Sequence, residues 1–176
     1  MGHAFISVGS NIGPAQNVRR AVRLLGRQVR IVGVSTFYRT KPLGRPEQPE
    51  FYNGVVAVET DIPAGELKHR VLRGIEEQLG RRRTEDKYAP RTIDLDVLLY
   101  DELVIDRDDL VIPDPEIAHR PFLAIPLEEL APELVLPGSG RPIKGIAAAF
   151  ADHQMSPLPE CTARLRKSVE HGPSQG

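Results

Sequence analysis

The sequence predicts an α+β fold of the ferredoxin-like type, a βαββαβ antiparallel sheet with helices on one face. Short β-prone runs alternate in that order with longer stretches whose apolar residues recur at helical spacing. The chain has 176 residues, of which 40% are hydrophobic and 27% charged, which is typical of one globular domain with its own core. On this topology the second face of the sheet stays free for a site covered by loops, with further helices at the C-terminal periphery.

The first half of the chain accounts for three strands and one helix. An apolar run at 4–8 ends in the glycine-containing turn 9–14, which indicates a strand followed by a tight turn. Val18, Ala21 and Leu25 recur at helical spacing, so a helix is expected there. The elements predicted are strands over 4–8, 29–38 and 54–60, a helix over 15–25, and a loop over 41–49, where three prolines prevent regular structure.

The second half supplies the remaining helix and strand of the core unit. An apolar stripe that includes Leu72 and Leu79 predicts a buried helical face ending at Gly80. We expect a helix over 63–80, a loop over 81–90, a strand over 92–100, a short strand at 103–105 pairing back on it, and peripheral helices over 122–130 and 143–150. Residues 1–150 are expected to form one domain, and 151–176, rich in Pro, Ser, His and Gly, a poorly ordered C-terminal tail.

Composition excludes several classes of partner and site. The net charge is −1, so no global basic field recruits nucleic acid or an anionic membrane. No run approaches the ~18 apolar residues of a membrane span. The first residues do not form a charged leader followed by a long apolar region, so no signal peptide is expected. Cys161 is the only cysteine, which excludes an intramolecular disulfide framework and a cysteine-rich zinc site. We expect a cytoplasmic protein, monomeric, with small molecules as its partners.

Two carboxylates, Asp94 and Asp96, interrupt an apolar β-prone run. Side chains two residues apart in a strand project from the same face, roughly 6–7 Å apart, and like charges so placed repel each other. A divalent cation between them removes the repulsion, and oxygen ligation of this kind suits Mg²⁺. The alternative is a solvated pair of charges on an edge strand, where such residues discourage aggregation.

Several arginines lie near the acidic pair in the sequence, most of them on its N-terminal side. Arg81, Arg82 and Arg83 follow the predicted helix, Arg91 precedes Asp94 by three residues, and Arg120 lies further along the chain. Guanidinium groups beside acidic metal ligands are the materials of phosphoryl transfer. The chain has no phosphate-binding loop with the glycine–lysine pattern, so arginines would have to bind the phosphates of ATP. The alternative for the run 81–83 is a solvated cluster favoured at a helix C-terminus.

A flat heterocycle is the kind of ligand that the few aromatic residues could recognise. Phe51 follows the proline-rich loop and Phe122 follows His119-Arg120-Pro121, so the two rings could sandwich a ligand across the free face of the sheet. Asn53 offers both a donor and an acceptor to the edge of such a ring. Ordinary core packing is the alternative for each Phe.

Six collinear segments together resemble the 6-hydroxymethyl-7,8-dihydropterin pyrophosphokinase family of the folate pathway, over roughly residues 4–137. The segments are 7–13, 37–44, 48–53, Glu76 with 80–83, 90–96 and 120–127. The resemblance implies transfer of the terminal diphosphate of ATP to the hydroxymethyl group of the pterin, with release of AMP. It also implies two Mg²⁺ ions.

The resemblance assigns expected roles to particular residues. Asp94 and Asp96 would hold the Mg²⁺ ions, and Arg81 and Arg91 would clamp the transferred group. The other expected contacts are Arg83 and Arg120 to the triphosphate; Glu76, Tyr88 and Val97 around the adenine; Phe51 and Phe122 stacking on the pterin; and Asn53, with the main chain of Thr40 and Leu43, at its polar edge.

The chain departs from the family pattern at three positions. Asp114 stands between two prolines where the family usually has His, so a nucleotide-contacting imidazole is replaced by a carboxylate. Ala89 stands where Gly is usual and Tyr88 where Trp is frequent. Two other functions stay open. One is a non-catalytic binding module such as an RNA-recognition domain, which the low positive charge disfavours. The other is the same chemistry on a related pterin.

Overall fold

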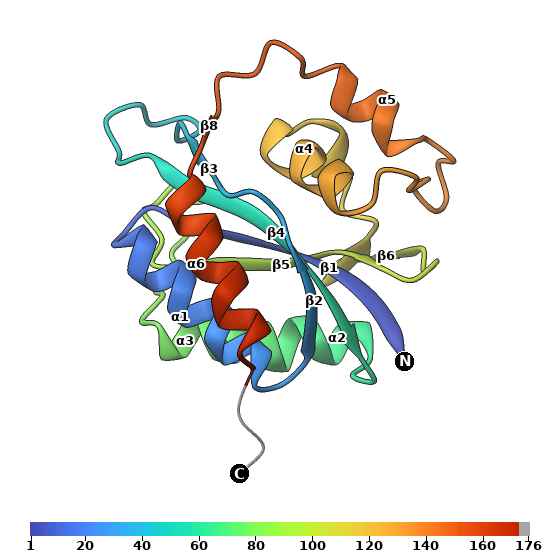
Figure 1. Ribbon diagram of the computed structural model, residues 1–176, viewed down its shortest axis with the longest axis horizontal. Helices are drawn as coiled ribbons and strands as arrows, with labels where there is room; N and C mark the ends of the chain where they lie inside the picture. Colours follow the sequence, from blue (N-terminus) through green and yellow to red (C-terminus); the bar gives the residue numbers. More distant parts are fainter. Residues whose placement is uncertain (173–176) are drawn as a thin grey trace.

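A single antiparallel sheet organises the computed structural model, which describes residues 1–172 (Figure 1). Strand β4 (Phe51–Thr60) lies at its centre and pairs with β1 from Tyr52 to Thr60. The sheet order is β5-β1-β4-β3-β8, with β2 also paired to β4. The other strands are β1 (Gly2–Ser10), β2 (Arg30–Val34), β3 (Tyr38–Thr40), β5 (Asp94–Tyr100) and β8 (Ser156–Pro157). The strands predicted over 4–8, 54–60 and 92–100 are confirmed, and the one expected over 29–38 is divided into β2 and β3.

The first face of the sheet carries the larger core. Helix α1 (Pro14–Gly26) buries Val18, Ala21, Val22 and Leu25 against it, as the spacing predicts. The helix expected over 63–80 is also present, as α2 (Ala64–Glu66), the π-helical turn η1 (Leu67–Leu72) and α3 (Arg73–Gln78).

Helix α6 (Pro159–Glu170) overturns the prediction of a poorly ordered tail after residue 151. It lies beside α1 and buries Leu165 and Thr162 (Figure 1). The Phe37 N–H donates to Thr162 Oγ1 at 2.9 Å, which ties α6 to the segment between β2 and β3. The prediction was wrong because the few apolar residues of α6 stand among five charged ones, a pattern that resembles a solvated segment until a partner surface is known. Residues 173–176 of the expected tail lie outside the described part.

The second face of the sheet is not free along its whole length, contrary to expectation. Helices α4 (Pro121–Leu130) and α5 (Ile143–Ala148) lie on the opposite side from α1 and α6 (Figure 1). Leu123 and Leu127 of α4 form a second core with Val55 and Leu99 of the sheet. A 3₁₀ turn, η2 (Pro115–Ala118), leads into α4. The apolar residues on this face of the sheet are buried because helices pack over them and exclude water.

The short strand expected at 103–105 does not pair with the preceding strand. Instead β6 (Ile105–Arg107) pairs with β7 (Leu110–Ile112) in a separate two-stranded sheet. No helix within residues 1–172 has both the length and the apolar character needed to cross a membrane.

Candidate active site

The two aspartates project from the second face of the sheet at its uncovered end. In the β1–β5 register Asp94 lies opposite Gly9 and Asp96 opposite Ser7, while Leu95 and Val97 point into the first core. The prediction that both carboxylates share one face is confirmed. Their side chains are 38% and 39% exposed, so a ligand can reach both.

Two arginines neutralise Asp94. Arg81 Nη1 lies 3.0 Å from Asp94 Oδ1, and Arg91 Nη1 lies 2.6 Å from Oδ2. The predicted grouping of Arg81, Arg91 and Asp94 is therefore present. Strand β5 is an edge strand of the main sheet, as the alternative supposed, but this carboxylate is paired with guanidinium groups rather than merely solvated.

Lys68 is the cation closest to the second aspartate, and sequence reasoning missed it. Its Nζ lies 3.5 Å from Asp96 Oδ1. Burial raises the pKa of Asp96, as does the charge of Asp94, while the ammonium of Lys68 lowers it. Lys68 lies in the π-helical turn η1, and a spacing rule based on the α-helix does not place a residue of a π turn. No signal in the sequence pointed to this contact.

Glu76 is a buried carboxylate that holds two of the arginines, Arg81 and Arg83, in place. It is only 2% exposed, and its carboxylate pairs with Arg81 and, at 2.7 Å, with Arg83. The Leu95 N–H donates to Glu76 Oε2 at 3.1 Å, so helix α3 is joined to the start of β5. The structure thus gives Glu76 a positioning role, and its expected contact with adenine stays a prediction.

A polar pair lies beside the carboxylates on the same face. Asn53 is opposite Gly9, which is in turn opposite Asp94, so the three residues lie side by side across β4, β1 and β5. Asn53 Nδ2 donates to Thr40 Oγ1 at 2.7 Å. A Cβ on Gly9 would stand 2.4 Å from Asn53 Oδ1, so only glycine leaves that amide in place.

The two predicted phenylalanines occupy different elements at this end of the sheet. Phe51 begins β4 opposite Thr40. Phe122, at the start of α4, packs against the second core, so the core-packing alternative holds at least in part. Stacking of both rings on a ligand stays a prediction.

The loops over 41–49 and 81–90 contact each other above the site. Gln48 Nε2 donates to the Tyr88 carbonyl at 2.6 Å, and Arg45 pairs with Asp86. The Tyr88 ring lies against Gly44, whose positive φ of 73° favours glycine. Leu43 and Tyr88 are both exposed, at 43% and 40%, and so are available to a ligand.

Asn11 joins these loops to the sheet and was another residue that sequence reasoning missed. Its side chain accepts from the Arg91 N–H at 2.7 Å and donates to Gln48 Oε1 at 3.2 Å. It is 2% exposed. The available signal was its place in the turn after β1, where Asn commonly bonds to nearby main chain.

Three further predicted residues are placed less directly. Arg120 Nε pairs with Glu116 at 2.7 Å, just before α4. Val97 is 1% exposed and its side chain packs in the first core, so it offers only main chain to a ligand. Burial raises the pKa of Asp114 to about 6, aided by the charge of Asp96.

Two accessible carboxylates, one paired with two guanidinium groups and the other near an ammonium, lie beside a polar pair. Such a site is suited to phosphoryl transfer onto a small polar acceptor. A sequence model of the family described as 7,8-dihydro-6-hydroxymethylpterin-pyrophosphokinase (HPPK) matches residues 5–132. The chain belongs to this family.

Named relatives agree with the family match. The 2-amino-4-hydroxy-6-hydroxymethyldihydropteridine pyrophosphokinase of Haemophilus influenzae is 37% identical over 158 residues, covering 88% of this chain and 97% of that protein. The enzyme of the same name from Methylorubrum extorquens is 40% identical over 142 residues, covering 78% and 88%.

A solved structure shares the fold. A crystal structure of Plasmodium falciparum HPPK-DHPS superimposes with a TM-score of 0.69 at 15% identity, over 86% of this chain. The chain spans 46% of the length of that two-part protein.

Proposed function

We propose that this protein transfers the terminal diphosphate of ATP to the hydroxymethyl group of 6-hydroxymethyl-7,8-dihydropterin and releases AMP. The observation that carries the proposal is the pair Asp94 and Asp96 on one exposed face, with Arg81 and Arg91 bonded to Asp94. Membership of the pyrophosphokinase family supports the same reaction.

The metal proposed for this site is Mg²⁺, as two ions held by Asp94 and Asp96. Both carboxylates are accessible, and Mg²⁺ commonly takes one or two carboxylates and completes its shell with water and phosphate oxygens. Within residues 1–172 no three His, Cys, Asp or Glu side chains are grouped to hold a metal, so phosphates would have to supply the remaining ligands. When bound, the metal would neutralise phosphate charge and polarise the transferred group.

The arginines would bind the transferred diphosphate. Arg81 and Arg91 already converge on Asp94, and a guanidinium bonds phosphate oxygens in a bidentate manner. Glu76 would hold Arg81 and Arg83 in place, so that positioning and charge neutralisation accelerate the reaction without a covalent intermediate. Arg120 and Tyr88, with the main chain of Val97, would complete the ATP site.

The pterin would lie on the second face beside the aspartates. Asn53, bonded to Thr40, would meet the polar edge of the ring, and Phe51 and Phe122 would pack on its faces. The main chain of Leu43 would close the site from the loop. This arrangement would bring the acceptor hydroxyl to the carboxylate pair.

We further assign the sheet to the ferredoxin-like topology, because β5, β1, β4 and the divided strand β2/β3 follow one another in the order 4-1-3-2 of a βαββαβ unit. Residues 1–150 are proposed to form one domain, to which α6 adds a helix on the first face. We also infer a monomeric, cytoplasmic enzyme.

Nucleotide analysis of the purified protein tests the proposed reaction. With ATP, Mg²⁺ and the pterin alcohol, we expect AMP and the pterin diphosphate in equal amounts. Appearance of ADP, or of no nucleotide product, contradicts the proposal. Side-by-side assays with related pterin alcohols identify the preferred acceptor.

Substitution of the acidic pair tests the proposed metal ligands. Asp94→Asn and Asp96→Asn should each reduce turnover at least about a hundred-fold, a loss of roughly 3 kcal/mol of transition-state stabilisation, while far-UV circular dichroism stays unchanged. Asp106→Asn, on exposed β6, is the matched control and should leave turnover unchanged. Near-normal turnover in either site variant would refute the role of that aspartate.

A further inference from the structure

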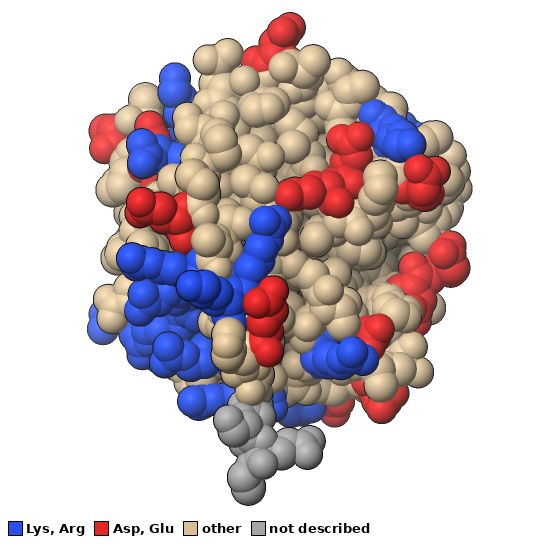
Figure 2. Space-filling model, in the orientation of Figure 1, with Lys and Arg blue, Asp and Glu red and all other residues tan. Residues whose placement is uncertain are grey.

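Lysine and arginine side chains gather on the face of the molecule formed by α1 and α6 (Figure 2). A cleft of about 310 Å³ between these helices is lined by Arg19, Arg23, Arg164, Lys167 and Ser168. Four of its five lining residues carry positive charge, and none carries negative charge. The net charge of the whole chain is −1, so this concentration of positive charge is local.

The cationic groups of the cleft lack acidic partners. Within residues 1–172 none of the four forms an ion pair with a carboxylate. Arg19 and Arg23 are one helical turn apart on α1, a spacing at which like charges repel. By contrast, the arginines around Asp94 and Glu76 are all paired.

Charges from both helices converge on one place. Arg19 and Arg23 of α1 and Arg164 and Lys167 of α6 line the same cleft, so the charged residues of the two helices face a shared space. An anion there would contact donors from both helices.

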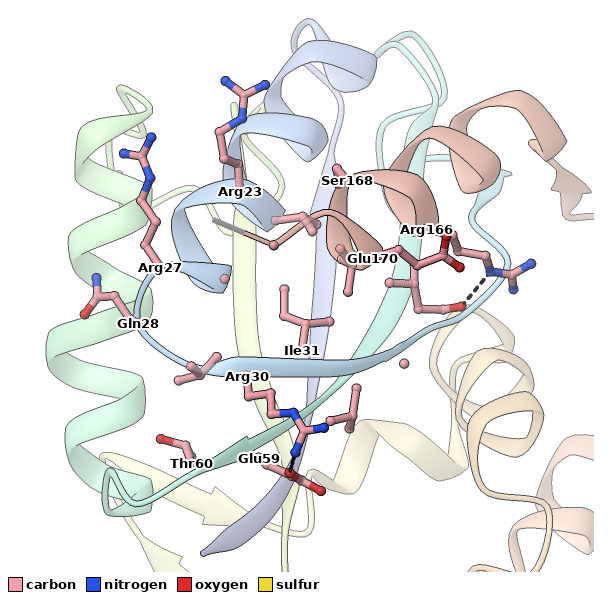
Figure 3. A pocket seen from close by; sticks show the side chains of 18 of the residues that line it. Arg23, Arg27, Gln28, Arg30, Ile31, Glu59, Thr60, Arg166, Ser168 and Glu170 are labelled. Carbon is pink, nitrogen blue, oxygen red and sulfur yellow. Dashed lines mark hydrogen bonds and ion pairs between the residues drawn. The ribbon is translucent and has the colours of Figure 1, made fainter. Parts of the chain in front are cut away.

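A larger groove of about 1450 Å³ adjoins the cleft and shares Arg23 and Ser168 with it. Figure 3 shows Arg23 and Arg27 extending from the end of α1 to the same side, away from the Arg30–Glu59 ion pair. Val29, Ile31 and Val169 also line the groove, together with Glu59, Asp61 and Glu170, so apolar side chains are available beside the cationic cleft.

We propose that the α1–α6 cleft binds a triphosphate group, either of a nucleotide or of inorganic triphosphate. A triphosphate carries several negative charges at neutral pH, since a single phosphoryl group already carries about −1.5 to −2, and these charges complement the four cations of the cleft. Three guanidinium groups and one ammonium offer many N–H donors for its oxygens. This site is separate from the carboxylate pair, because α1 and α6 cover the first face of the sheet and Asp94 and Asp96 project from the second.

Site-resolved NMR titration with sodium tripolyphosphate in the absence of Mg²⁺ tests the proposal. We expect shifts in backbone amides of α1 and α6, and weakening of binding as salt rises. Arg164→Gln should weaken binding at these amides about five-fold, the effect of one charge at contact distance in water. Arg141→Gln is the matched control, since Arg141 is exposed, has no ion pair within the described residues and lies next to α5 on the other face.

A second titration, with ATP, distinguishes a nucleotide from inorganic triphosphate as the ligand of the cleft. Binding through a nucleotide predicts additional shifts at residues 29–32 of the adjoining groove and tighter binding than inorganic triphosphate. Equal binding without those shifts assigns the cleft to the inorganic anion. No α1 or α6 shifts at millimolar triphosphate, or equal losses for Arg164→Gln and Arg141→Gln, would overturn the proposal whatever the outcome of the diphosphate-transfer assay.

Discussion

Removing the buried carboxylate of Glu76 should destabilise the protein as well as its active site. Its side chain is 3% exposed, Arg81 beside it is 9% exposed, and the Leu95 N–H also depends on it. Glu76→Ala therefore leaves a buried guanidinium without one partner and a buried N–H without an acceptor. Breaking a buried ion pair typically costs about 3–5 kcal/mol.

The lower end of that range applies here, because Arg81 keeps its contact with Asp94 at 3.0 Å. We expect the free energy of unfolding to fall by about 3 kcal/mol, which for a domain of this size lowers Tm by roughly 6–12 °C. Glu76→Gln retains an oxygen for the Leu95 N–H and should lose about half as much.

Urea denaturation followed by circular dichroism measures these changes directly. The matched control is Glu77→Ala on the same helix, since Glu77 is exposed and has no ion pair within the described residues; it should change stability by less than about 0.5 kcal/mol. If Glu76→Ala were as stable as Glu77→Ala, the argument that a buried carboxylate holds the arginines would fail.

Three other substitutions test separate parts of the structure. Gly9→Ala should displace the Asn53 amide and raise KM for the pterin about ten-fold, whereas Gly145→Ala, with open space around it, should leave KM unchanged; equal KM values would contradict the placement of the amide. Asp114 has a folded pKa of about 6 against 3.8 unfolded, so it binds its proton more tightly when folded and destabilises the fold as pH rises through that window. The stability of Asp114→Asn relative to wild type, from urea titrations, should therefore increase by about 1–2 kcal/mol from pH 4 to pH 7, and a flat difference would refute the shift. Leu165→Ala should cost about 2–4 kcal/mol in thermal or urea unfolding, and a loss below about 1 kcal/mol would mean that α6 is not part of the core.

Local patterns predicted the residues whose placement depends on their own strand or helix. Asp94 and Asp96 share a face because alternation in a strand is a property of the backbone, and α1 buries the apolar residues that its spacing indicates. Arg91 lies close enough along the chain to reach Asp94.

Contacts between distant segments were beyond such patterns. Asn11 bonds to Arg91 across 80 residues of sequence, and the Phe37 N–H reaches Thr162 across 125. Nothing in either local sequence encodes the partner. Helix α6 was missed for the same reason, since its buried residues become recognisable only once the surface of α1 and β2 is present.

The candidate site lies where helix α4 no longer covers the second face of the sheet. Leu123 and Leu127 of α4 protect the apolar residues Val55 and Leu99, which need a helix over them. Further along the same strands the residues become Asn53 and the aspartates, which need solvent or a ligand instead. The sheet therefore changes from core to site within two residues of β4.

The charges at that open end must be balanced before any ligand arrives. Arg81 and Arg91 neutralise Asp94, and Lys68 lies near Asp96. An incoming nucleotide would bring phosphates that compete for the same cations. The buried Glu76 pairs with Arg81 from the core side. If Arg81 binds the transferred diphosphate as proposed, Glu76 would keep that guanidinium in position while it exchanges Asp94 for phosphate, so the loss of Glu76 should affect stability and turnover together.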